Sequence, residues 1–278
     1  MSLNLTIFLI FYLLIIMSTI GFGYFIINIT NLSRLNFSYG YLGLFGIFFL
    51  IFYSYLSHFF IAHEYINNLF ILILGFFFFL YYFNKDDNKK IFIIVVLFFL
   101  FIFIAFLIYK PHDDFPYYHF PYTYYLTQNK LLIGVGNFNH GFRTPSSIFY
   151  LNSLFYLPII RYFFFQVGSV MIMGFVSLIF LENIRKHLKI KNYNITFFLT
   201  LMSFVFVNIF FYRVGEHGTD RSAQILIFLI IIELLIIINI KKYIKENSAK
   251  LLVLLGLIIS LKAFYILYIS LLLPIFYF

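Results

Sequence analysis

The chain has 278 residues, of which 63% are hydrophobic and 10% are charged, and its mean hydropathy is +0.99. These values lie far from those of a soluble globular domain, so the sequence predicts a polytopic membrane protein. No cysteine is present, which excludes disulfides, thiolate metal sites and cysteine nucleophiles. The formal charge of +9 resides in short loops between apolar runs, where Lys and Arg orient spans in a bilayer, so we expect no nucleic-acid partner.

About eight apolar runs are long enough to cross the hydrocarbon core of a bilayer, which takes about 20 residues. Backbone groups in lipid must be paired within the segment, and these runs lack the alternation of barrel strands, so we expect an all-α, polytopic transmembrane helical bundle. The first run is too long for a signal-peptide core, and we expect it to be retained. The predicted spans lie near residues 4–28, 38–61, 66–83, 91–109, 158–181, 195–212, 222–240 and 251–275.

No internal repeat or linker divides the chain, so we expect a single membrane domain over residues 1–278. Residues 1–90 hold three leading spans, and residues 91–278 hold the remainder. Within the one long loop, the stretch 146–157 is apolar enough to form an interfacial or re-entrant helix. The apolar sequence that runs up to Phe278 predicts an N-terminal fragment of a longer protein.

Basic residues mark one side of this arrangement. Three connections carry them, and in an eight-helix count all three lie on the same side, which the positive-inside rule assigns to the cytoplasm. The opposite side then receives the N-terminus, the His63–Glu64 turn, the long 110–157 loop and the 213–221 loop. We therefore expect an integral protein of a bacterial inner membrane whose active face is extracytoplasmic. The basic residues are Lys85, Lys89, Lys90, Arg185, Lys186, Lys189, Lys191, Lys241, Lys242, Lys245 and Lys250.

The long loop opens with two adjacent carboxylates, Asp113 and Asp114, directly after an apolar span and Lys110. Only 10 acidic residues occur in the whole chain, so this pair is the first place to look for chemistry. A helix is expected to begin here, with Asp114 as N-cap, a kink at Pro121 and a stop near residues 134–136. Two interpretations stay open: the pair carries catalysis, or Asp114 caps the helix and Asp113 faces water.

Side chains suited to sugars and phosphates surround the acidic pair in sequence. Tyr117 and Tyr118 belong to an aromatic ladder whose rings can stack on a sugar while their hydroxyls bond it, and they are equally suited to an interfacial belt. His112 and His140 add hydrogen-bonding groups. Arg143 suits either a phosphate or an anchoring position at lipid headgroups.

The 213–221 loop is the second polar segment predicted on this side, and its two glycines let it fold tightly. Together with the first acidic pair it offers oxygen and imidazole ligands for a divalent cation such as Mg²⁺ or Mn²⁺, at a spacing that matches no specific motif. Asp220 is equally suited to cap the next helix, with Arg221 reaching the headgroups. The candidate ligands are His112, Asp113, Asp114, Glu216, His217 and Asp220.

Two charges, Glu233 and Lys262, fall inside predicted spans, where an unpaired charge is costly. Counted from the predicted cytoplasmic ends, their depths differ by roughly 6 Å, which a lysine side chain can cover, so we expect them to pair or to face a polar cavity. A structural pair between two helices is one interpretation. The alternative is a transporter or channel component in which Glu233 and Lys262 line the path.

The order of these features resembles the first external loop of membrane glycosyltransferases of the GT-C fold. In that family a span is followed by an acidic residue or pair that opens a large external loop with a juxtamembrane helix; here the span is 91–109 and the pair is Asp113-Asp114. The resemblance covers residues 89–182 and extends more loosely to the 213–221 loop. The chain differs in having three spans before this unit. The resemblance implies transfer of a sugar from a polyprenyl-phosphate carrier to an acceptor at the outer face of the membrane.

The resemblance also implies roles for individual residues. Asp113 or Asp114 would be the general base, or would hold a metal that offsets the charge of the leaving phosphate. Arg143, and less directly Lys262, would meet the lipid phosphate, and the aromatic helix would cradle the sugar or the prenyl chain. Substrate contacts are thus expected from His112, Tyr117, Tyr118, His140, Arg143, Glu216, His217, Asp220 and Lys262.

Overall fold

The computed structural model describes residues 4–32, 37–85, 89–108, 111–143, 146–240 and 245–277, and these residues form helices and loops with one isolated bridge, between Leu157 and Arg161. The all-α expectation is confirmed for this part of the chain. Lys110, Lys241 and Lys242 lie outside the described residues. The longer helices are α1 (Leu5–Ile29), α2 (Tyr39–His58), α3 (Tyr65–Phe83), α4 (Lys89–Leu107), α7 (Val167–Ile190), α8 (Ile195–Phe210), α9 (Asp220–Ile240), α10 (Lys245–Leu261) and η6 (Ala263–Tyr277).

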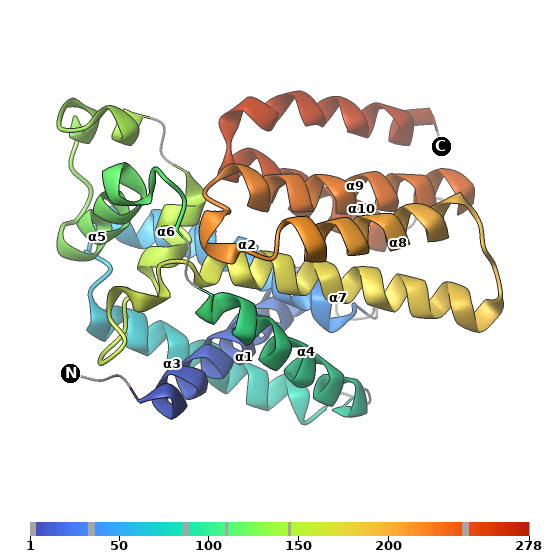
Figure 1. Cartoon of the computed structure of the whole chain (residues 1–278), viewed down its shortest axis with the longest axis horizontal. Helices are drawn as coiled ribbons and strands as arrows, with labels where there is room; N and C mark the ends of the chain where they lie inside the picture. Colours follow the sequence, from blue (N-terminus) through green and yellow to red (C-terminus); the bar gives the residue numbers. More distant parts are fainter. Residues whose placement is uncertain are drawn as a thin grey trace.

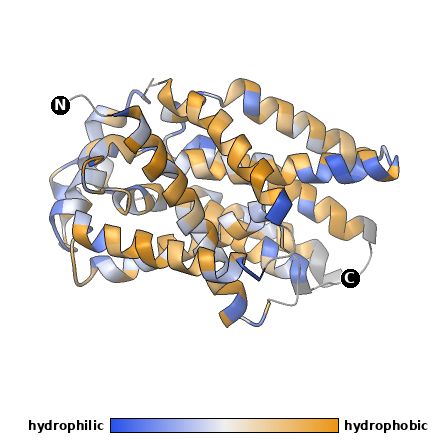
Figure 2. Cartoon of the chain, turned by 90° about the horizontal axis from the view of Figure 1, so that it is seen from below, coloured by the Kyte–Doolittle hydropathy of each residue, from blue (hydrophilic) through white to orange (hydrophobic). Residues whose placement is uncertain are grey.

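Among the described residues, 6 helices are long and apolar enough to cross a membrane. They are α1, α2, α3, α4, α9 and the segment Tyr162–Ile190, which contains α7. Most of the long helices lie along the long axis of the molecule (Figure 1), and hydrophobic residues cover them over most of their length (Figure 2). The first seven predicted runs each correspond to one helix, although α8 is shorter than the others.

The eighth predicted run, 251–275, is not a single span. Helix α10 ends at Leu261, and η6 begins at Ala263 and runs back over the bundle in the opposite direction (Figure 1). Lys262 therefore lies in the turn between them, where its backbone N–H still bonds the Ile258 carbonyl at 3.2 Å. At this position the ammonium group lies at the end of a helix and not in the middle of an apolar one, where a charge would be costly in a bilayer.

Helix α7 forms the centre of the bundle. In the most apolar window of the segment Tyr162–Ile190, 94% of the residues are buried inside the protein, against 28% for α3. The predicted span 158–181 was placed too early, because α7 begins at Val167 and continues to Ile190. Its last turns hold Arg185, Lys186 and Lys189, which lie beyond the apolar part of the helix.

Helices α1 and α2 approach each other closely through glycines. A Cβ atom at Gly46 would lie 1.8 Å from the Thr19 carbonyl oxygen, and one at Gly23 would lie 1.9 Å from the Leu42 carbonyl oxygen. Only a residue without a side chain fits at these two positions, as is common where apolar helices associate through small residues.

One end of the bundle, here named the loop end, gathers the connections at residues 58–64, 111–143, 146–161 and 211–219. His63 bridges two of them: its N–H bonds the Leu126 carbonyl at 3.0 Å and its ring contacts the Ser153 hydroxyl at 2.6 Å. Asn68 donates to the carbonyls of His63 and Ser153 at 2.7 and 2.8 Å. These bonds fix α6 (Ser147–Ser153), whose residues are all buried, so this part of the apolar stretch 146–157 is helical and covered by protein.

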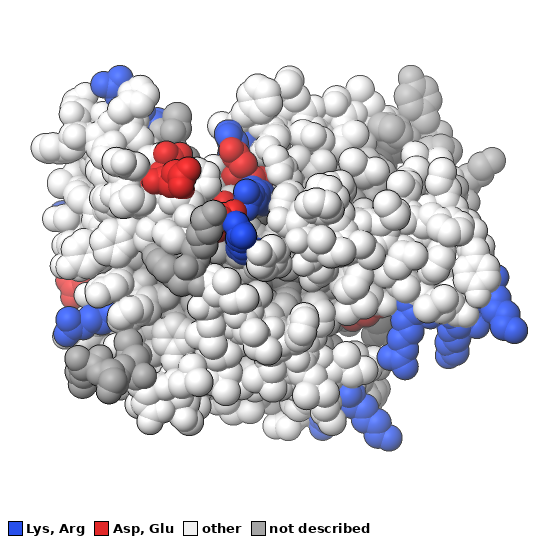
Figure 3. Space-filling view, in the orientation of Figure 1, with Lys and Arg blue, Asp and Glu red and all other residues white. Residues whose placement is uncertain are grey.

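The opposite end of the bundle, here named the basic end, carries most of the exposed lysines and arginines of the long helices, seen at the right in Figure 3. Lys250 at the start of α10 lies 4.5 Å over the Tyr41 ring at the start of α2, which places both starts at this end. The predicted segregation of basic and polar loops to two ends is thus present in the structure.

Candidate functional site

The long loop at the loop end begins with an unusual helical turn. Residues Phe115–His119 form a π-helical turn, η1, which passes directly into α5 (Phe120–Gln128). The Asp114 carbonyl accepts backbone N–H bonds from Tyr117 and Tyr118, both at 3.1 Å. π-Turns of this kind occur frequently at functional sites because they re-aim side chains. The predicted helix is confirmed in outline, but it ends at Gln128, before the glycines predicted to stop it.

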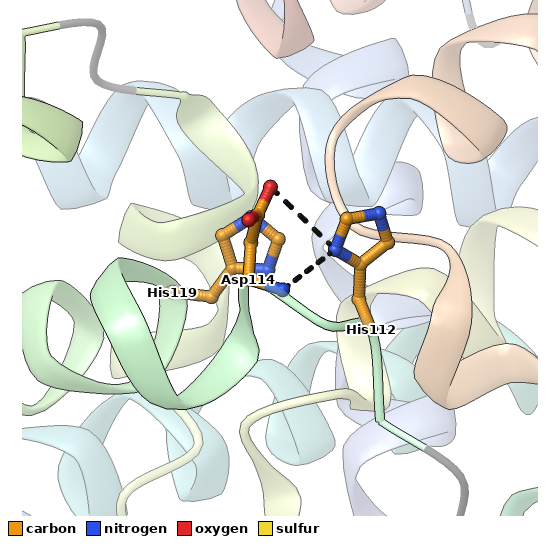
Figure 4. A group of neighbouring side chains, drawn as sticks. All are labelled: His112, Asp114 and His119. Atoms are coloured by element: carbon orange, nitrogen blue, oxygen red, sulfur yellow. Dashed lines mark hydrogen bonds and ion pairs between the residues drawn. The ribbon is translucent and has the colours of Figure 1, made fainter.

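The Asp114 carboxylate makes no capping hydrogen bond, although its residue precedes the helix. It accepts instead from the Tyr118 hydroxyl at 3.2 Å and lies 3.7 Å from Nδ1 of His112. The Asp114 backbone N–H also donates to that nitrogen at 3.1 Å. Figure 4 shows both approaches, with the His119 ring beside them. Of the two interpretations of this carboxylate, capping is therefore the one that the geometry does not support.

His119 completes this group, and the sequence analysis missed it. Its ring centroid lies 5.4 Å from that of His112, and only 6% of the residue is exposed. Burial lowers the pKa of His119 to about 4, with a further contribution from His112 and opposing ones from Asp114 and Asp220. Among so many aromatic residues, a histidine is easily taken for an interfacial residue. His119 lies five residues after Asp114, a spacing that brings two residues together in a π-turn but not in an ordinary α-helix.

The 213–221 loop packs against the start of the long loop. The His112 N–H donates to the Gly215 carbonyl at 3.0 Å. Gly218 has a φ of +51° and packs against both imidazoles: a Cβ atom there would lie 3.1 Å from Cε1 of His119 and 3.6 Å from Cδ2 of His112. The two loops predicted to share one face therefore meet in one site.

Ion pairs line the second loop. The Lys262 ammonium pairs with the Asp220 carboxylate, and Glu216 accepts from Arg221 at 2.9 Å and Arg213 at 3.3 Å. Charged atoms of both signs gather on the two sides of a notch at the upper left of Figure 3. Arg221 thus binds Glu216 instead of snorkelling alone.

The predicted pairing of Glu233 with Lys262 is wrong. Glu233 is buried in α9 and accepts a hydrogen bond from the Tyr41 hydroxyl near the basic end. It lies roughly 20 Å along the helix axis from Asp220, the actual partner of Lys262, at a rise of 1.5 Å per residue. The error follows from treating 251–275 as one straight span.

The remaining predicted residues divide into buried and exposed groups. His217 is buried and its Nε2 bonds the Phe211 carbonyl at 2.6 Å, while burial lowers the pKa of His217 to about 4. Its role is to hold the second loop in place. Asp113, Tyr117 and His140 are exposed, and no hydrogen bond of their side chains is found among the described residues.

Arg143 is also exposed, and its Nε donates to the Gly136 carbonyl at 3.2 Å within its own loop. The loop nevertheless supports the site. Asn139 donates to the Tyr117 carbonyl at 3.0 Å, and a Cβ atom at Gly141 would lie 2.4 Å from the Tyr118 ring. These contacts fix the tyrosine that bonds Asp114, and half-burial with the nearby Asp114 charge raises the pKa of Tyr118 to about 12.

Two cavities adjoin the group. One of about 410 Å³ lies between the loop-end halves of α1 and α4 and the η1–α5 segment. A second, of about 20 Å³, reaches His119 and Gly218. Phe115, Phe165 and Gln166 line both, and Nε2 of Gln166 is buried without a hydrogen-bond partner among the residues that the structure describes. The large cavity is lined by Phe8, Phe106, Leu107, Phe115, Phe120, Tyr162, Phe163, Phe165 and Gln166.

Potential metal ligands converge at one place in the described part of the chain. Atoms of His112, Asp114 and His119 that can bind a metal all lie within 4.8 Å of one another. Asp113, Glu216, His217 and Asp220, predicted to take part, are outside this group. Three of the four are turned to solvent or engaged in ion pairs, and His217 is bonded to a backbone carbonyl.

Comparison with known proteins identifies a family and no activity. A family model described as "Domain of unknown function (DUF8201)" matches residues 5–278, so the chain belongs to that family. No curated protein matches the chain, and no solved structure matches it.

Proposed function

We propose that this member of the DUF8201 family is an integral-membrane glycosyltransferase that moves a sugar from a polyprenyl-phosphate donor to an acceptor at the extracytoplasmic face. The observation that carries the proposal is the placement of Asp114. Its carboxylate makes no capping hydrogen bond, is half-exposed, and is one residue away from Phe115, which lines an aromatic cavity of about 410 Å³, large enough for part of a lipid chain.

The proposed chemistry assigns each group one step. The acceptor hydroxyl attacks the anomeric carbon of the donor sugar, its proton passes to the Asp114 carboxylate, and the bond from that carbon to the phosphate oxygen breaks. The donated bond from Tyr118 at 3.2 Å orients the carboxylate. The leaving polyprenyl phosphate gains charge, and the cations of the second loop that would turn to it are Lys262 and Arg221, which pair with Asp220 and Glu216 while no phosphate is bound.

The aromatic cavity supports a lipid-linked donor. Its walls are phenylalanines, a tyrosine and a leucine, with the Gln166 amide as the polar exception. Lipid chains enter apolar cavities because burial removes their surface from water, and the phosphate would then remain at the polar rim. The positive-inside rule, applied to the basic end, supports an extracytoplasmic position for this rim.

The transporter alternative loses its main argument. Glu233 and Lys262 were expected to line one path, yet they bind different partners, Tyr41 and Asp220, near opposite ends of the bundle. No specific observation in the described residues favours transport.

The test compares two neighbouring carboxylates. The full chain is reconstituted in liposomes with a panel of radiolabelled polyprenyl-phosphate sugars and membrane acceptors, and consumption of the lipid-linked sugar is followed. Asp114→Asn should lower turnover by about 100-fold or more, because it removes the proton acceptor. Asp113→Asn, an adjacent and exposed position, is the matched control and should stay within about threefold. Equal turnover in wild type and Asp114→Asn would refute the role of Asp114, and no turnover with any lipid-linked sugar in the wild type would refute the function.

A further inference from the structure

His119 is a buried imidazole with unused hydrogen-bonding capacity. Only 6% of the residue is exposed, and its ring nitrogens make no hydrogen bond to the described part of the chain. These nitrogens are not fully enclosed, and His119 lines the small cavity that also reaches Gly218, so they are accessible to a ligand. Its neighbours are the His112 ring and the Asp114 carboxylate, drawn together in Figure 4.

These three side chains have the chemistry of a metal site. Two neutral imidazoles and one carboxylate form a donor set that suits Zn²⁺, Mn²⁺ or Fe²⁺ and suits Mg²⁺ poorly, since Mg²⁺ prefers oxygen ligands alone. The exposed edges of His112 and Asp114 leave a route for an ion to enter.

The geometry needs only a small adjustment. Ligand atoms around a tetrahedral zinc lie roughly 3.3 Å apart, so donor atoms up to 4.8 Å apart must close by about 1.5 Å at most. His112 and Asp114 lie in the loop that precedes η1, where side-chain rotation can supply this movement. In the structure, Nδ1 of His112 accepts the Asp114 N–H at 3.1 Å, and ligation would replace that bond.

We propose that His112, Asp114 and His119 bind one divalent transition-metal ion, with Zn²⁺ and Mn²⁺ as the most suitable ions. Three protein ligands leave a coordination position open, as in catalytic metal sites. Gly218 lies against both imidazoles, so the second loop covers the site and excludes bulk water from that side. The proposal goes beyond sugar transfer, because the ion binds whichever reaction it serves. If transfer is the reaction, the ion would take over from Asp114 the activation of the acceptor hydroxyl or the stabilisation of the phosphate.

The experiment measures metal binding by the purified full chain without donor or acceptor. The protein, carrying a tag that lacks histidine, is stripped with a chelator, titrated with Zn²⁺ or Mn²⁺ in detergent, and analysed for bound metal by mass spectrometry. Co²⁺ is added in a parallel sample, because its visible spectrum reports the coordination geometry. We expect one equivalent of ion. His119→Gln and His112→Gln should each weaken binding by at least 10-fold.

His187→Gln is the matched control, because it removes an imidazole at the basic end, where that ring bonds the Asn192 carbonyl. It should bind metal as the wild type does. If His119→Gln unfolds, the half-exposed Asp114→Asn serves as the second test, and saturating metal should raise the unfolding midpoint of the wild type but not of this variant. Absence of a stoichiometric ion in the wild type, or undiminished binding in both histidine variants and Asp114→Asn, overturns the metal site. Because no sugar donor is present, these results are independent of the glycosyltransferase assay.

Discussion

The close approach of α1 and α2 predicts a large effect for the smallest possible substitution. In Gly46→Ala, the added methyl group would lie 1.8 Å from the Thr19 carbonyl oxygen, where ordinary contacts begin at 3.4 Å. The oxygen belongs to a helical backbone and cannot rotate away, so the two helices must separate by about 1.5 Å over this contact. Overpacking of this kind costs about 1–3 kcal/mol, and a clash with backbone falls at the upper end of that range; because the benefit of alanine in a helix offsets about 1 kcal/mol, a net loss of about 1–2 kcal/mol remains.

The matched control is Gly256→Ala in α10. A Cβ atom there would meet Cε2 of Phe48 at 2.8 Å, and that ring is 37% exposed, so it can swing aside. The chain has no Trp and no Cys, so unfolding is best followed by circular dichroism during heating in mild detergent. Gly46→Ala should lower the midpoint by roughly 2–6 °C, while Gly256→Ala should leave it unchanged or raise it.

Equal midpoints for Gly46→Ala and the wild type would refute this reasoning. They would mean that α1 and α2 are farther apart than described, and that small residues do not set their packing. A matching loss in Gly256→Ala would instead show that the method responds to any methyl group added to a helical glycine.

Two further predictions concern charge at the loop end. Burial lowers the pKa of His63 to about 3, and His58 contributes to the shift, so the unfolded chain binds more protons once the pH falls below about 6.5. His63 should therefore contribute about 2 kcal/mol to a decline in stability between pH 7 and pH 5, to which the lowered pKa values of His119 and His217 add, and His63→Gln should make the decline measured by unfolding at the two pH values shallower by about that amount; an equally steep decline in the variant would contradict this assignment. Lys262→Met should change the free energy of unfolding by less than about 1 kcal/mol, because the side chains of Lys262 and Asp220 are 41% and 48% exposed, yet it should slow sugar transfer by about 10-fold. Loss of folding with unchanged specific activity would mean that this pair is structural.

The metal proposal and the transfer proposal meet at one residue, Asp114, but they make different demands on its neighbours. A general base needs only Tyr118 to orient it, whereas a metal site needs both imidazoles. Replacing His119 therefore separates the two: transfer that survives Gln at this position while metal binding is lost would leave Asp114 as a base acting without an ion.

The sequence by itself determined the class of the protein and the segregation of its loops. Hydropathy is a property of a continuous stretch of residues, so seven of the eight predicted runs each overlap one helix. Two predicted runs separate the 111–143 and 213–221 segments, so the chain returns to the same end between them. The hydrogen bond from His112 to Gly215 shows that the two segments meet there. The acidic pair was therefore placed beside the correct second loop before any contact was known.

Only the tertiary structure decided which residues in those loops meet. The π-turn at Phe115–His119 brings His119 beside Asp114 and leaves the adjacent Asp113 exposed. The sequence alone gives no means of telling these two aspartates apart. Because the chain turns after Leu261, Lys262 pairs with Asp220, 42 residues away in sequence. Glu233 instead accepts a hydrogen bond from Tyr41, 192 residues away. Which side chains pair depends on packing between segments that are distant in sequence, whereas hydropathy is a local property of the chain. For this reason the helices could be predicted from the sequence, and the residues that form the site could be identified only from the contacts between helices and loops.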